Sequence, residues 1–326
     1  MNSLSCSVAV ATYNGEKYIL EQLESICNQS RKPDEVIICD DRSCDRTYSI
    51  IEEYINSNNL NTTWQLKKNK TNKGYARNFI ECAMDTKSDI IFYCDQDDIW
   101  DLHKIESMMA VLESDASADA VHCFTLTIDG TANHQRTLFD LYKTKTLNGK
   151  IERVDLTEML RYGRSAGLCL AFRRKLLPNV NRWNLEFGIP HDLPVGYIAS
   201  LQHGYRSLNS ALVRRRITGD NLSRPHKTLR SRISDPLYQI DSNKNNLKIF
   251  NALLHDSTIH LSSEDHELVQ RGYDLLEESI DALSRKNILK LFTLIFRRCS
   301  SVDIARRLVN LFCAIFGKYE KSAASE

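Results

Sequence analysis

Residues 90–100 read Ile-Ile-Phe-Tyr-Cys-Asp-Gln-Asp-Asp-Ile-Trp and give the strongest indication of the fold class. Its first five residues are apolar or aromatic, a run that is too short for a helix and typical of a strand buried on both faces. Such strands belong to parallel sheets that helices cover. Asp95 and Asp97 then stand two residues apart. Extended backbone would point both side chains to one side, where they can bind one hard cation such as Mg²⁺ or Mn²⁺.

Plainer explanations of these acids stay open. Asp98 can serve only as the N-cap of the next helix, and clusters of Asp after a strand often form solvated turns. An EF-hand calcium loop is excluded, because Trp100 falls where that loop needs glycine and Ile99 where it needs a ligand. If the acids do bind a cation, a nucleotide diphosphate is its usual second ligand, since Mg²⁺ and Mn²⁺ keep positions that phosphate oxygens fill.

The composition sets the class of protein. The chain has 326 residues and a formal net charge of +1, so it can hold one large α/β domain with a smaller appendage and gives no electrostatic case for nucleic-acid binding. Its 10 cysteines include no Cys-x-x-Cys pair and often lie in apolar runs, as expected of buried thiols in a reducing cytoplasm. Neither a signal peptide nor a membrane-spanning helix is predicted.

Apolar runs alternate with helical periodicity along the first part of the chain. Strands are predicted at 7–11, 36–39, 63–66, 90–94, 120–126 and 165–173, and helices near 19–27, 50–55, 75–83, 102–112 and 195–202. This alternation predicts an α/β fold with a mixed, mostly parallel sheet flanked by helices. Ligands of such sheets bind at the carboxyl ends of the strands.

Polar residues follow three of these strands. Thr12, Tyr13 and Asn14 come after the first strand, a pair of aspartates at 40–41 after the second, and the acids at 95–98 after the fourth. Three coincident strand ends predict one ligand pocket. The first turn lacks both the P-loop and the Gly-x-Gly-x-x-Gly patterns, so a nucleotide would have to be held through base, ribose and metal.

Four motifs, taken together, resemble those of family 2 glycosyltransferases of the GT-A fold. They are Val-Ala-Val-Ala-Thr-Tyr-Asn-Gly at 8–15, Asp-Asp-x-Ser-x-Asp-x-Thr at 40–47, Asn-x-Gly-x-x-Arg-Asn at 72–78 and Cys-Asp-Gln-Asp-Asp-Ile-Trp at 94–100. The resemblance is greatest to the bacterial rhamnosyltransferase-like branch and covers about two thirds of the chain. It implies a GT-A domain over 1–225, followed by a helical C-terminal extension over 226–326.

The resemblance implies roles for single residues. Tyr13 would lie against the nucleobase, Asp41 would accept a hydrogen bond from it, and Asp97 would coordinate the metal, with Asp95 at the metal or the ribose. The implied donor site consists of Thr12, Tyr13, Asn14, Asp41, Gly74, Arg77, Asp95 and Arg216.

Asp192 is the implied general base. It follows Gly-Ile-Pro-His at 188–191, where the family carries an acid that deprotonates the acceptor hydroxyl while the anomeric carbon inverts. Without that context, a carboxylate here would be read as a helix N-cap. Glu186 is the second candidate for the base, and His191 is expected to position other groups. Gly167, in a strand similar to the one beneath the donor sugar, would either admit a ligand or serve packing alone.

Two positions depart from the family pattern. Arg42 replaces the glycine that usually follows the paired aspartates. Thr218 replaces a histidine of the closing segment, where Arg216, Gly219 and Asn221 match. The arginines at 214–216 could take over phosphate binding, although three consecutive arginines also suit a solvated surface.

Lys, Arg, Ser and Asn dominate the sequence from about Pro225 to Asn246, and helical periodicity returns only after Asn246. The C-terminal part then combines apolar and basic residues at helical spacing. The segments 288–296 and 304–316 predict two amphipathic helices with a basic edge. Such helices can lie on an anionic membrane surface or pack as a small cap.

These expectations describe a cytoplasmic, metal-dependent, inverting glycosyltransferase of the hexosyltransferase type, peripheral to the membrane if those helices bind it. The resemblance suggests dTDP-rhamnose as donor and a bacterial surface polysaccharide or lipid-linked glycan as acceptor. Two alternatives stay open. One is a nucleotidyltransferase, although residues 12–17 are a poor match to the glycine-rich, lysine-bearing first loop that it needs. The other is a nucleotide- or glycan-binding module without catalysis, which Arg42 and Thr218 would allow.

Overall fold

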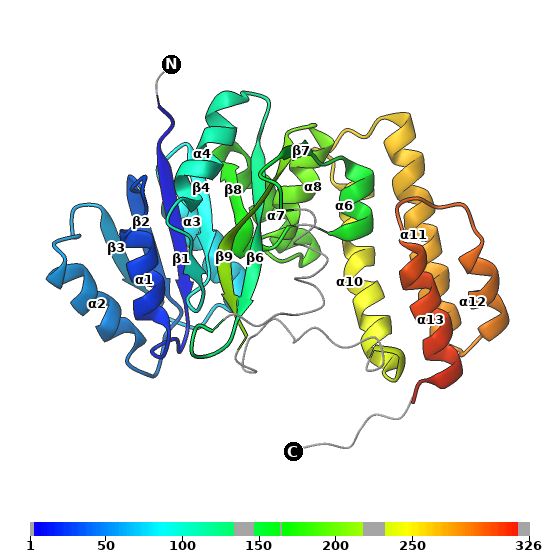
Figure 1. Cartoon of the computed structure of the whole chain (residues 1–326). Coiled ribbons are helices and arrows are strands. Elements are labelled where there is room, and N and C mark those ends of the chain that lie inside the picture. Colours follow the sequence, from blue (N-terminus) through cyan, green and yellow to red (C-terminus); the bar gives the residue numbers. More distant parts are fainter. Residues whose placement is uncertain (1–2, 134–146, 164, 218–231, 319–326) are drawn as a thin grey trace. The chain divides into compact units, whose positions relative to one another are not determined.

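The computed structural model describes residues 3–133, 147–163, 165–217 and 232–318. The chain forms two compact units. Unit 1 comprises Met1–Asp155, Arg164–Glu186 and Pro190–Asp220, and unit 2 comprises Leu156–Gly163, Phe187–Ile189 and Asn221–Glu326. The sheet lies in unit 1, and unit 2 is helical where it is described (Figure 1). The division predicted at residue 225 stays a prediction.

Unit 1 is built on one mixed sheet. Its strands are β1 Cys6–Thr12, β2 Glu35–Asp40, β3 Trp64–Lys68, β4 Ile90–Cys94, β5 Ile99–Trp100, β6 Ala120–Ile128, β7 Ile151–Arg153, β8 Leu170–Arg173 and β9 Tyr205–Arg216. They are ordered β3-β2-β1-β4-β8-β6-β9-β5, with β7 also paired to β9. Strands β1 to β4 pair in parallel, as do β6 and β9, whereas β8, β5 and β7 run antiparallel to their neighbours.

Helices cover this sheet, as Figure 1 shows. They are α1 Ile19–Cys27, α2 Thr47–Ser57, α3 Tyr75–Asp85, α4 Lys104–Ser114, α7 Leu177–Phe187 and α8 Leu193–Leu201. The predicted α/β class with a mixed, mostly parallel sheet flanked by helices is therefore confirmed. Strand β1 is buried along its whole length, and so is β4, because both lie inside the sheet and have helices over their faces.

One strand prediction was wrong in part. Of the predicted strand at 165–173, only β8 is extended, and it is preceded by a 3-10 turn at Gly167–Cys169. The N–H of Gly167 donates to the Asp192 carboxylate at 3.2 Å instead of to a neighbouring strand. A Cβ at this glycine would lie 2.8 Å from Nε2 of His191, so a side chain from the 190–192 loop occupies the space that the missing Cβ leaves.

Unit 2 contains α6 Leu156–Tyr162, α10 Pro236–His255, α11 Ser263–Ser284, α12 Ile288–Ile295 and α13 Ile304–Phe316. Helix α10 begins inside a stretch that looked polar and non-helical. The carboxylate of Asp235 caps it by accepting from the N–H of Tyr238, and Pro236 occupies its first turn. Its inner face is partly polar, since buried Asn243 donates to Asn310 of α13 at 3.1 Å, and this hid the helical period.

The ten cysteines are all free thiols. Over the described ranges, none of the helices combines the length and the hydropathy that crossing a membrane requires.

Candidate functional site

The polar strand ends meet at one edge of the sheet. Strand β1 lies between β2 and β4, and its residue Thr12 pairs with Asp40, while Val10 pairs with Cys94. Because these three strands are parallel and in register, the segments that follow them leave the sheet side by side. The structure thus brings the first three predicted groups of site residues together.

The loops after β1 and β2 are locked to each other by hydrogen bonds. Thr12 Oγ1 donates to the buried Asp40 carboxylate, which also accepts from the N–H of Ser43 at 3.0 Å. Ser43 Oγ in turn accepts from the N–H of Asn14, and the side-chain oxygen of Asn14 accepts from the N–H of Cys44. Thr12 and Asn14 therefore shape the loop that presents Tyr13, whose side chain is 43% exposed.

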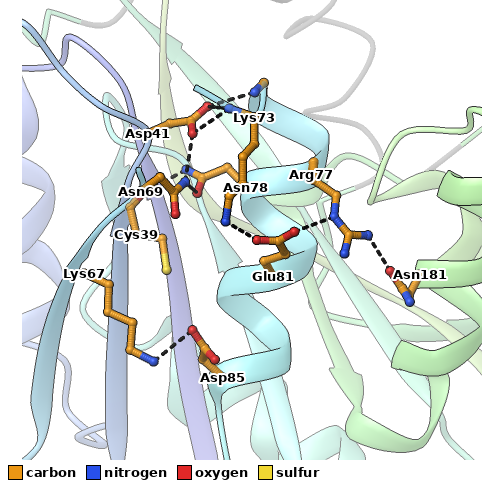
Figure 2. A network of polar contacts seen from close by, with 11 residues as sticks. Cys39, Asp41, Lys67, Asn69, Lys73, Arg77, Asn78, Glu81, Asp85 and Asn181 are labelled. Atoms are coloured by element: carbon orange, nitrogen blue, oxygen red, sulfur yellow. Dashed lines mark hydrogen bonds and ion pairs between the residues drawn. The ribbon is translucent and has the colours of Figure 1, made fainter. Parts of the chain in front are cut away.

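Asp41 holds the loop that precedes α3 (Figure 2). Its buried carboxylate accepts from Asn69 Nδ2 at 2.8 Å and from the backbone N–H groups of Lys73 and Gly74 at 2.9 Å each. Gly74 has φ of +78°, a conformation that suits glycine. The implied contact between Asp41 and a nucleobase stays a prediction, and these bonds show that the carboxylate also organises its own loop.

Arg77 connects α3 with α7. Its Nε donates to Glu81 at 2.7 Å, and one terminal nitrogen donates to Asn181 at 2.6 Å (Figure 2). Lys73 also pairs with Glu81. Partial burial raises the pKa of the Glu81 carboxyl group, but its hydrogen bonds with Lys73 and Arg77 outweigh this effect, so the pKa is lowered.

The loop 95–98 concentrates negative charge at the end of β4. Asp95 and Asp97 are half-buried, and Asp98 is buried. Burial, followed by the charges of Asp97 and Asp192, raises the pKa of Asp95 to about 7, while Arg215 acts in the opposite direction. Asp98 is not the N-cap of α4, whose cap residue is His103. Its carboxylate instead accepts from the N–H of Arg216 at 2.9 Å, and burial raises its pKa.

Gln96, between the two acids, was not given a role from the sequence. Its Oε1 accepts from the N–H of Tyr13 at 2.8 Å, and its Nε2 donates to the carbonyl of Tyr13 at 3.0 Å. The amide lies so close to the first loop that a Cβ on Gly15 would be 2.4 Å from Oε1. Gln96 thereby joins the acidic loop to the residue expected to contact the base.

Arg216 is fully buried behind the acidic loop. Its Nε donates to the carbonyl of Asp97 at 3.0 Å, one terminal nitrogen donates to the carbonyl of Gly130 at 3.1 Å, and the other pairs with Glu21 at 2.6 Å. The guanidinium also lies 4.5 Å from the centre of the Tyr18 ring. These contacts show a residue that supports the loop from inside the protein, while its implied contact with the donor stays a prediction.

Lys104 is a second buried cation, and unlike Arg216 it was not identified from the sequence. Its Nζ donates to the carbonyl of Leu168 at 2.7 Å and lies 3.5 Å from the centre of the Trp100 ring. Burial lowers the pKa of its ammonium group. This cation counteracts the rise in the pKa of Asp95.

Asp192 lies at the start of α8, facing the 3-10 turn. One carboxylate oxygen accepts from the N–H of Leu193 at 2.9 Å, as an N-cap does, and the other accepts from the N–H of Gly167. Its charge contributes to raising the pKa of Asp95, so the two carboxylates are within electrostatic reach of each other. Glu186, the second candidate for the base, is exposed in the last turn of α7.

His191 sits in an aromatic cluster next to Asp192. Its ring is stacked on Phe79 with centres 4.1 Å apart and meets Tyr93 edge-on at 4.8 Å. Neither ring nitrogen has a hydrogen-bond partner among the described residues, and the Tyr93 hydroxyl has none there either. Burial lowers the pKa of His191, although the charge of Asp192 opposes this. The imidazole is therefore a neutral packing element beside the candidate base.

The acids at 95 and 97 suit a divalent cation that is shared with a ligand. In the part of the chain that the structure describes, no group of three or more His, Cys, Asp or Glu side chains could enclose a metal ion. The charge of Asp97 contributes to raising the pKa of Asp95, as expected of two neighbouring carboxylates. Mg²⁺ or Mn²⁺ would neutralise this concentration of negative charge. Both ions accept such partial protein coordination when phosphate oxygens and water supply the rest.

The other predicted positions fall elsewhere. Thr218, Gly219 and Asn221 lie outside the described residues. A surface hollow of about 500 Å³ lies between α1 and α2, and none of the predicted site residues lines it.

Comparison with known proteins identifies relatives. The model of the family described as Glycosyl transferase family 2 matches residues 7–179, just over half of the chain. The chain is 38% identical over 106 residues to the dTDP-rhamnosyl transferase RfbG of Shigella flexneri, covering 32% of this chain and 36% of that protein. It is 34% identical over 109 residues to the poly(ribitol-phosphate) beta-N-acetylglucosaminyltransferase TarS of Staphylococcus aureus, covering 33% and 18%. The matched segments span less than half of the curated relatives.

Solved structures extend the likeness to nearly the whole chain. A crystal structure of part of TarS in complex with UDP-GlcNAc superimposes with a TM-score of 0.58 at 16% identity, covering 95% of this chain and 89% of that one. The mannosyltransferase PcManGT from Pyrobaculum calidifontis, in complex with GDP-Man and Mn²⁺, gives a TM-score of 0.56 at 16% identity, covering 97% and 87%. At these identities the likeness shows the fold alone, and it confirms the predicted GT-A architecture.

Proposed function

The chain belongs to glycosyl transferase family 2, and we propose that it moves a sugar from a nucleotide diphosphate to a hydroxyl group of a glycan, with inversion at the anomeric carbon. The observation that carries the proposal is the approach of two acids from separate elements. Asp95 follows β4 and Asp192 caps α8, yet the ring of Tyr93 in β4 meets the ring of His191, the neighbour of Asp192, edge-on at 4.8 Å, and the charge of Asp192 contributes to raising the pKa of Asp95. This arrangement suits a donor held at one acid and a base acting at the other.

We assign each acid a separate task in the reaction. Asp192 removes the proton of the acceptor hydroxyl while the hydroxyl oxygen forms a bond to the anomeric carbon. The bond from that carbon to the diphosphate breaks on the opposite face, and the electron pair leaves with the nucleoside diphosphate. The two backbone N–H groups that Asp192 accepts from hold its carboxylate in a fixed orientation. A divalent cation at Asp95 and Asp97 would neutralise the charge on the leaving diphosphate.

The rest of the donor site follows from the loops. The exposed ring of Tyr13 would stack on the nucleobase, on a backbone that Gln96 and the Asp40 network hold in place. Arg77 would lie near the nucleotide, at the start of α3. Arg216 would act indirectly, by holding the carbonyl of Asp97.

The names of the relatives support a substrate class. RfbG is named for dTDP-rhamnosyl transfer and TarS for acetylglucosaminyl transfer to poly(ribitol-phosphate), so relatives of similar identity differ in donor sugar. We propose a bacterial surface polysaccharide or a lipid-linked glycan as acceptor, and dTDP-rhamnose as the first donor to test. The free thiols of all ten cysteines support action in a reducing compartment such as the cytoplasm.

The test measures donor binding and turnover separately. Nucleotide sugars are screened for thermal stabilisation with Mn²⁺ or Mg²⁺, beginning with dTDP-rhamnose, UDP-GlcNAc and UDP-glucose. Asp97→Ala should remove the metal-dependent part of donor binding. Asp192→Asn should keep donor binding and lower kcat by a factor of roughly 10² to 10⁴, the usual contribution of a general base. Glu186→Gln is the matched control and should leave both unchanged.

Two results would contradict the proposal. Equal loss of turnover in Asp192→Asn and Glu186→Gln would show that Asp192 has no special role. Donor binding by the unaltered chain, without product from any acceptor glycan tested, would favour a nucleotide-sugar-binding module instead.

A further inference from the structure

Helices α12 and α13 are neighbours within unit 2 (Figure 1). Both helices carry exposed apolar side chains. Leu289 and Phe296 are 76% and 72% exposed, and Phe316 is 66% exposed. The complete set of exposed apolar side chains on this face, which we call the α12–α13 face, is Ile288, Leu289, Phe292, Phe296, Ile304, Leu308, Phe312, Ile315 and Phe316. A water-exposed face of a folded domain normally carries polar residues at such positions.

The face is separate from the core of unit 2. Leu291 and Ile295 of α12 are buried together with Val309 and Cys313 of α13, in a cluster that also includes residues of α10 and α11. Both helices therefore already bury one apolar side. The second apolar side is surplus to the packing of this unit, so its function has to be sought outside it.

Charge identifies the kind of partner. Residues 285–318 include eight basic residues and one acidic residue, Asp303, whereas the whole chain has a net charge of only +1. Lys290 and Arg297 pair with Glu278 of α11 and flank the face, and Arg298 is exposed next to Phe296. Apolar side chains surrounded by lysine and arginine complement a surface that is apolar beneath a layer of negative charge.

A second copy of the chain is a poorer match to this surface. A symmetric dimer through the α12–α13 face would bring its exposed basic residues against those of the second copy, and like charges that face each other at an interface are unfavourable. We propose that the α12–α13 face docks on the surface of an anionic lipid bilayer, with the phenylalanine and leucine side chains at the headgroup boundary and the basic residues at the lipid phosphates. The inference does not depend on the glycosyltransferase site.

The test is co-sedimentation of the full chain with vesicles of phosphatidylcholine alone and of phosphatidylcholine mixed with phosphatidylglycerol. The chain should bind the anionic vesicles and bind the neutral ones much more weakly, and raised salt should release it. The double variant Leu289→Gln, Phe296→Gln should lower the partition coefficient roughly tenfold or more, because each side chain would lose its apolar contact with the bilayer. The matched control is Leu185→Gln, which alters an exposed leucine of α7 in unit 1 and should bind as the unaltered chain does.

A second pair of variants tests the charges. Arg298→Glu should weaken binding to anionic vesicles several-fold, since each basic residue near such a surface contributes about 1 kcal/mol. Lys87→Glu, an exposed basic residue of unit 1, should have no effect. Turnover of a water-soluble acceptor should be equal in all four variants, which separates this inference from the proposed activity.

Two outcomes would overturn the inference. One is equal vesicle binding by the double variant and the unaltered chain. The other is an absence of vesicle binding together with a concentration-dependent dimer in sedimentation velocity that the double variant abolishes; this result would assign the face to self-association instead.

Discussion

The side-chain amide of Gln96 is hydrogen-bonded at both of its ends to the backbone of Tyr13. One residue of the acidic loop thus fixes the main chain of a residue 83 positions earlier. Since Gln96 lies between Asp95 and Asp97, any displacement of the acidic loop would be transmitted to the exposed ring of Tyr13. This contact therefore connects the part of the proposed donor site that would bind the metal with the part that would bind the nucleobase.

Gln96→Ala should weaken nucleotide binding. The variant loses both hydrogen bonds to Tyr13, and at about 1 kcal/mol for each bond the Kd for a nucleoside diphosphate should rise by up to roughly thirtyfold. The Kd should rise both with and without Mn²⁺, because the two hydrogen bonds position Tyr13, which is proposed to contact the nucleobase and not the metal. Isothermal titration measures both conditions. Gln65→Ala, an exposed glutamine of β3, is the control, and a weakening of Gln96→Ala confined to the metal-containing titration would contradict the explanation.

Arg42→Gly should raise the free energy of unfolding slightly. Arg42 has φ of +66°, which costs a residue with a side chain about 1 kcal/mol or more, and this explains why the family carries glycine there. The greater freedom of glycine in the unfolded chain offsets part of the gain, so the net stabilisation should be about 0.5 kcal/mol.

The control for this substitution is Lys244→Gly, at an exposed position inside α10. It should destabilise by about 1 kcal/mol, since glycine is unfavourable in a helix interior. Urea unfolding measures both variants. A loss of stability in Arg42→Gly would show that the bond from Arg42 to the carbonyl of Lys70 outweighs the backbone strain.

Arg216→Lys should distinguish the effect of the hydrogen bonds that Arg216 makes to the acidic loop from the effect of its positive charge. Lysine keeps the positive charge but cannot reproduce the fork that reaches the carbonyls of Asp97 and Gly130 together with Glu21. We expect a loss of about 2 kcal/mol or more in stability from the unpaired buried groups, and weaker metal-dependent donor binding under conditions where the variant is folded. The control Arg214→Lys alters an exposed arginine of the same strand. Metal-dependent binding that is unchanged in folded Arg216→Lys would refute the supporting role.

His191 should make stability depend on pH. Burial lowers the pKa of its imidazole in the folded protein below the ordinary value of about 6.5. The unfolded chain therefore takes up more protons than the folded one as the pH falls below about 6.5, and the free energy of unfolding decreases in that range. His191→Phe keeps a ring against Phe79 and cannot bind a proton, so its stability should fall less between about pH 7 and pH 5. Urea unfolding at several pH values measures this, and parallel curves for the two proteins would contradict it.

Much of the fold could be predicted because its information is local. Continuous apolar runs such as Ile90–Cys94 are buried strands, and the polar residues after them do lie at one sheet edge. The turn at Gly167 and the helix α10 were misjudged for opposite reasons. The apolar run at 165–173 was predicted as one strand, although the N–H of Gly167 within it donates to Asp192. The polar stretch at the start of α10 did not look helical, because the inner face of this helix consists partly of asparagine and glutamine.

The candidate site was harder to predict than the fold. The acids, Tyr13 and Arg216 could be found from motifs, but the contacts that hold the acids and Tyr13 in place could not. Gln96 and Arg216 act over separations of 83 and 119 residues, and the sequence predicted neither the role of Gln96 nor the contact of Arg216 with the acidic loop. These long-range hydrogen bonds can be identified only when both partners are placed in three dimensions, and a single sequence does not provide that placement.

The position of Arg216 at the end of β9 has a consequence for biosynthesis. A nascent chain that has emerged only as far as residue 179, where the family match ends, already contains Asp95, Asp97 and Asp98. It lacks the strand whose last residue binds the carbonyl of Asp97 and donates its N–H to Asp98. Ribosome-bound intermediates of this length would therefore expose an unsupported acidic loop, and competence to capture a cation with its nucleotide would arise only after residue 216 has left the exit tunnel.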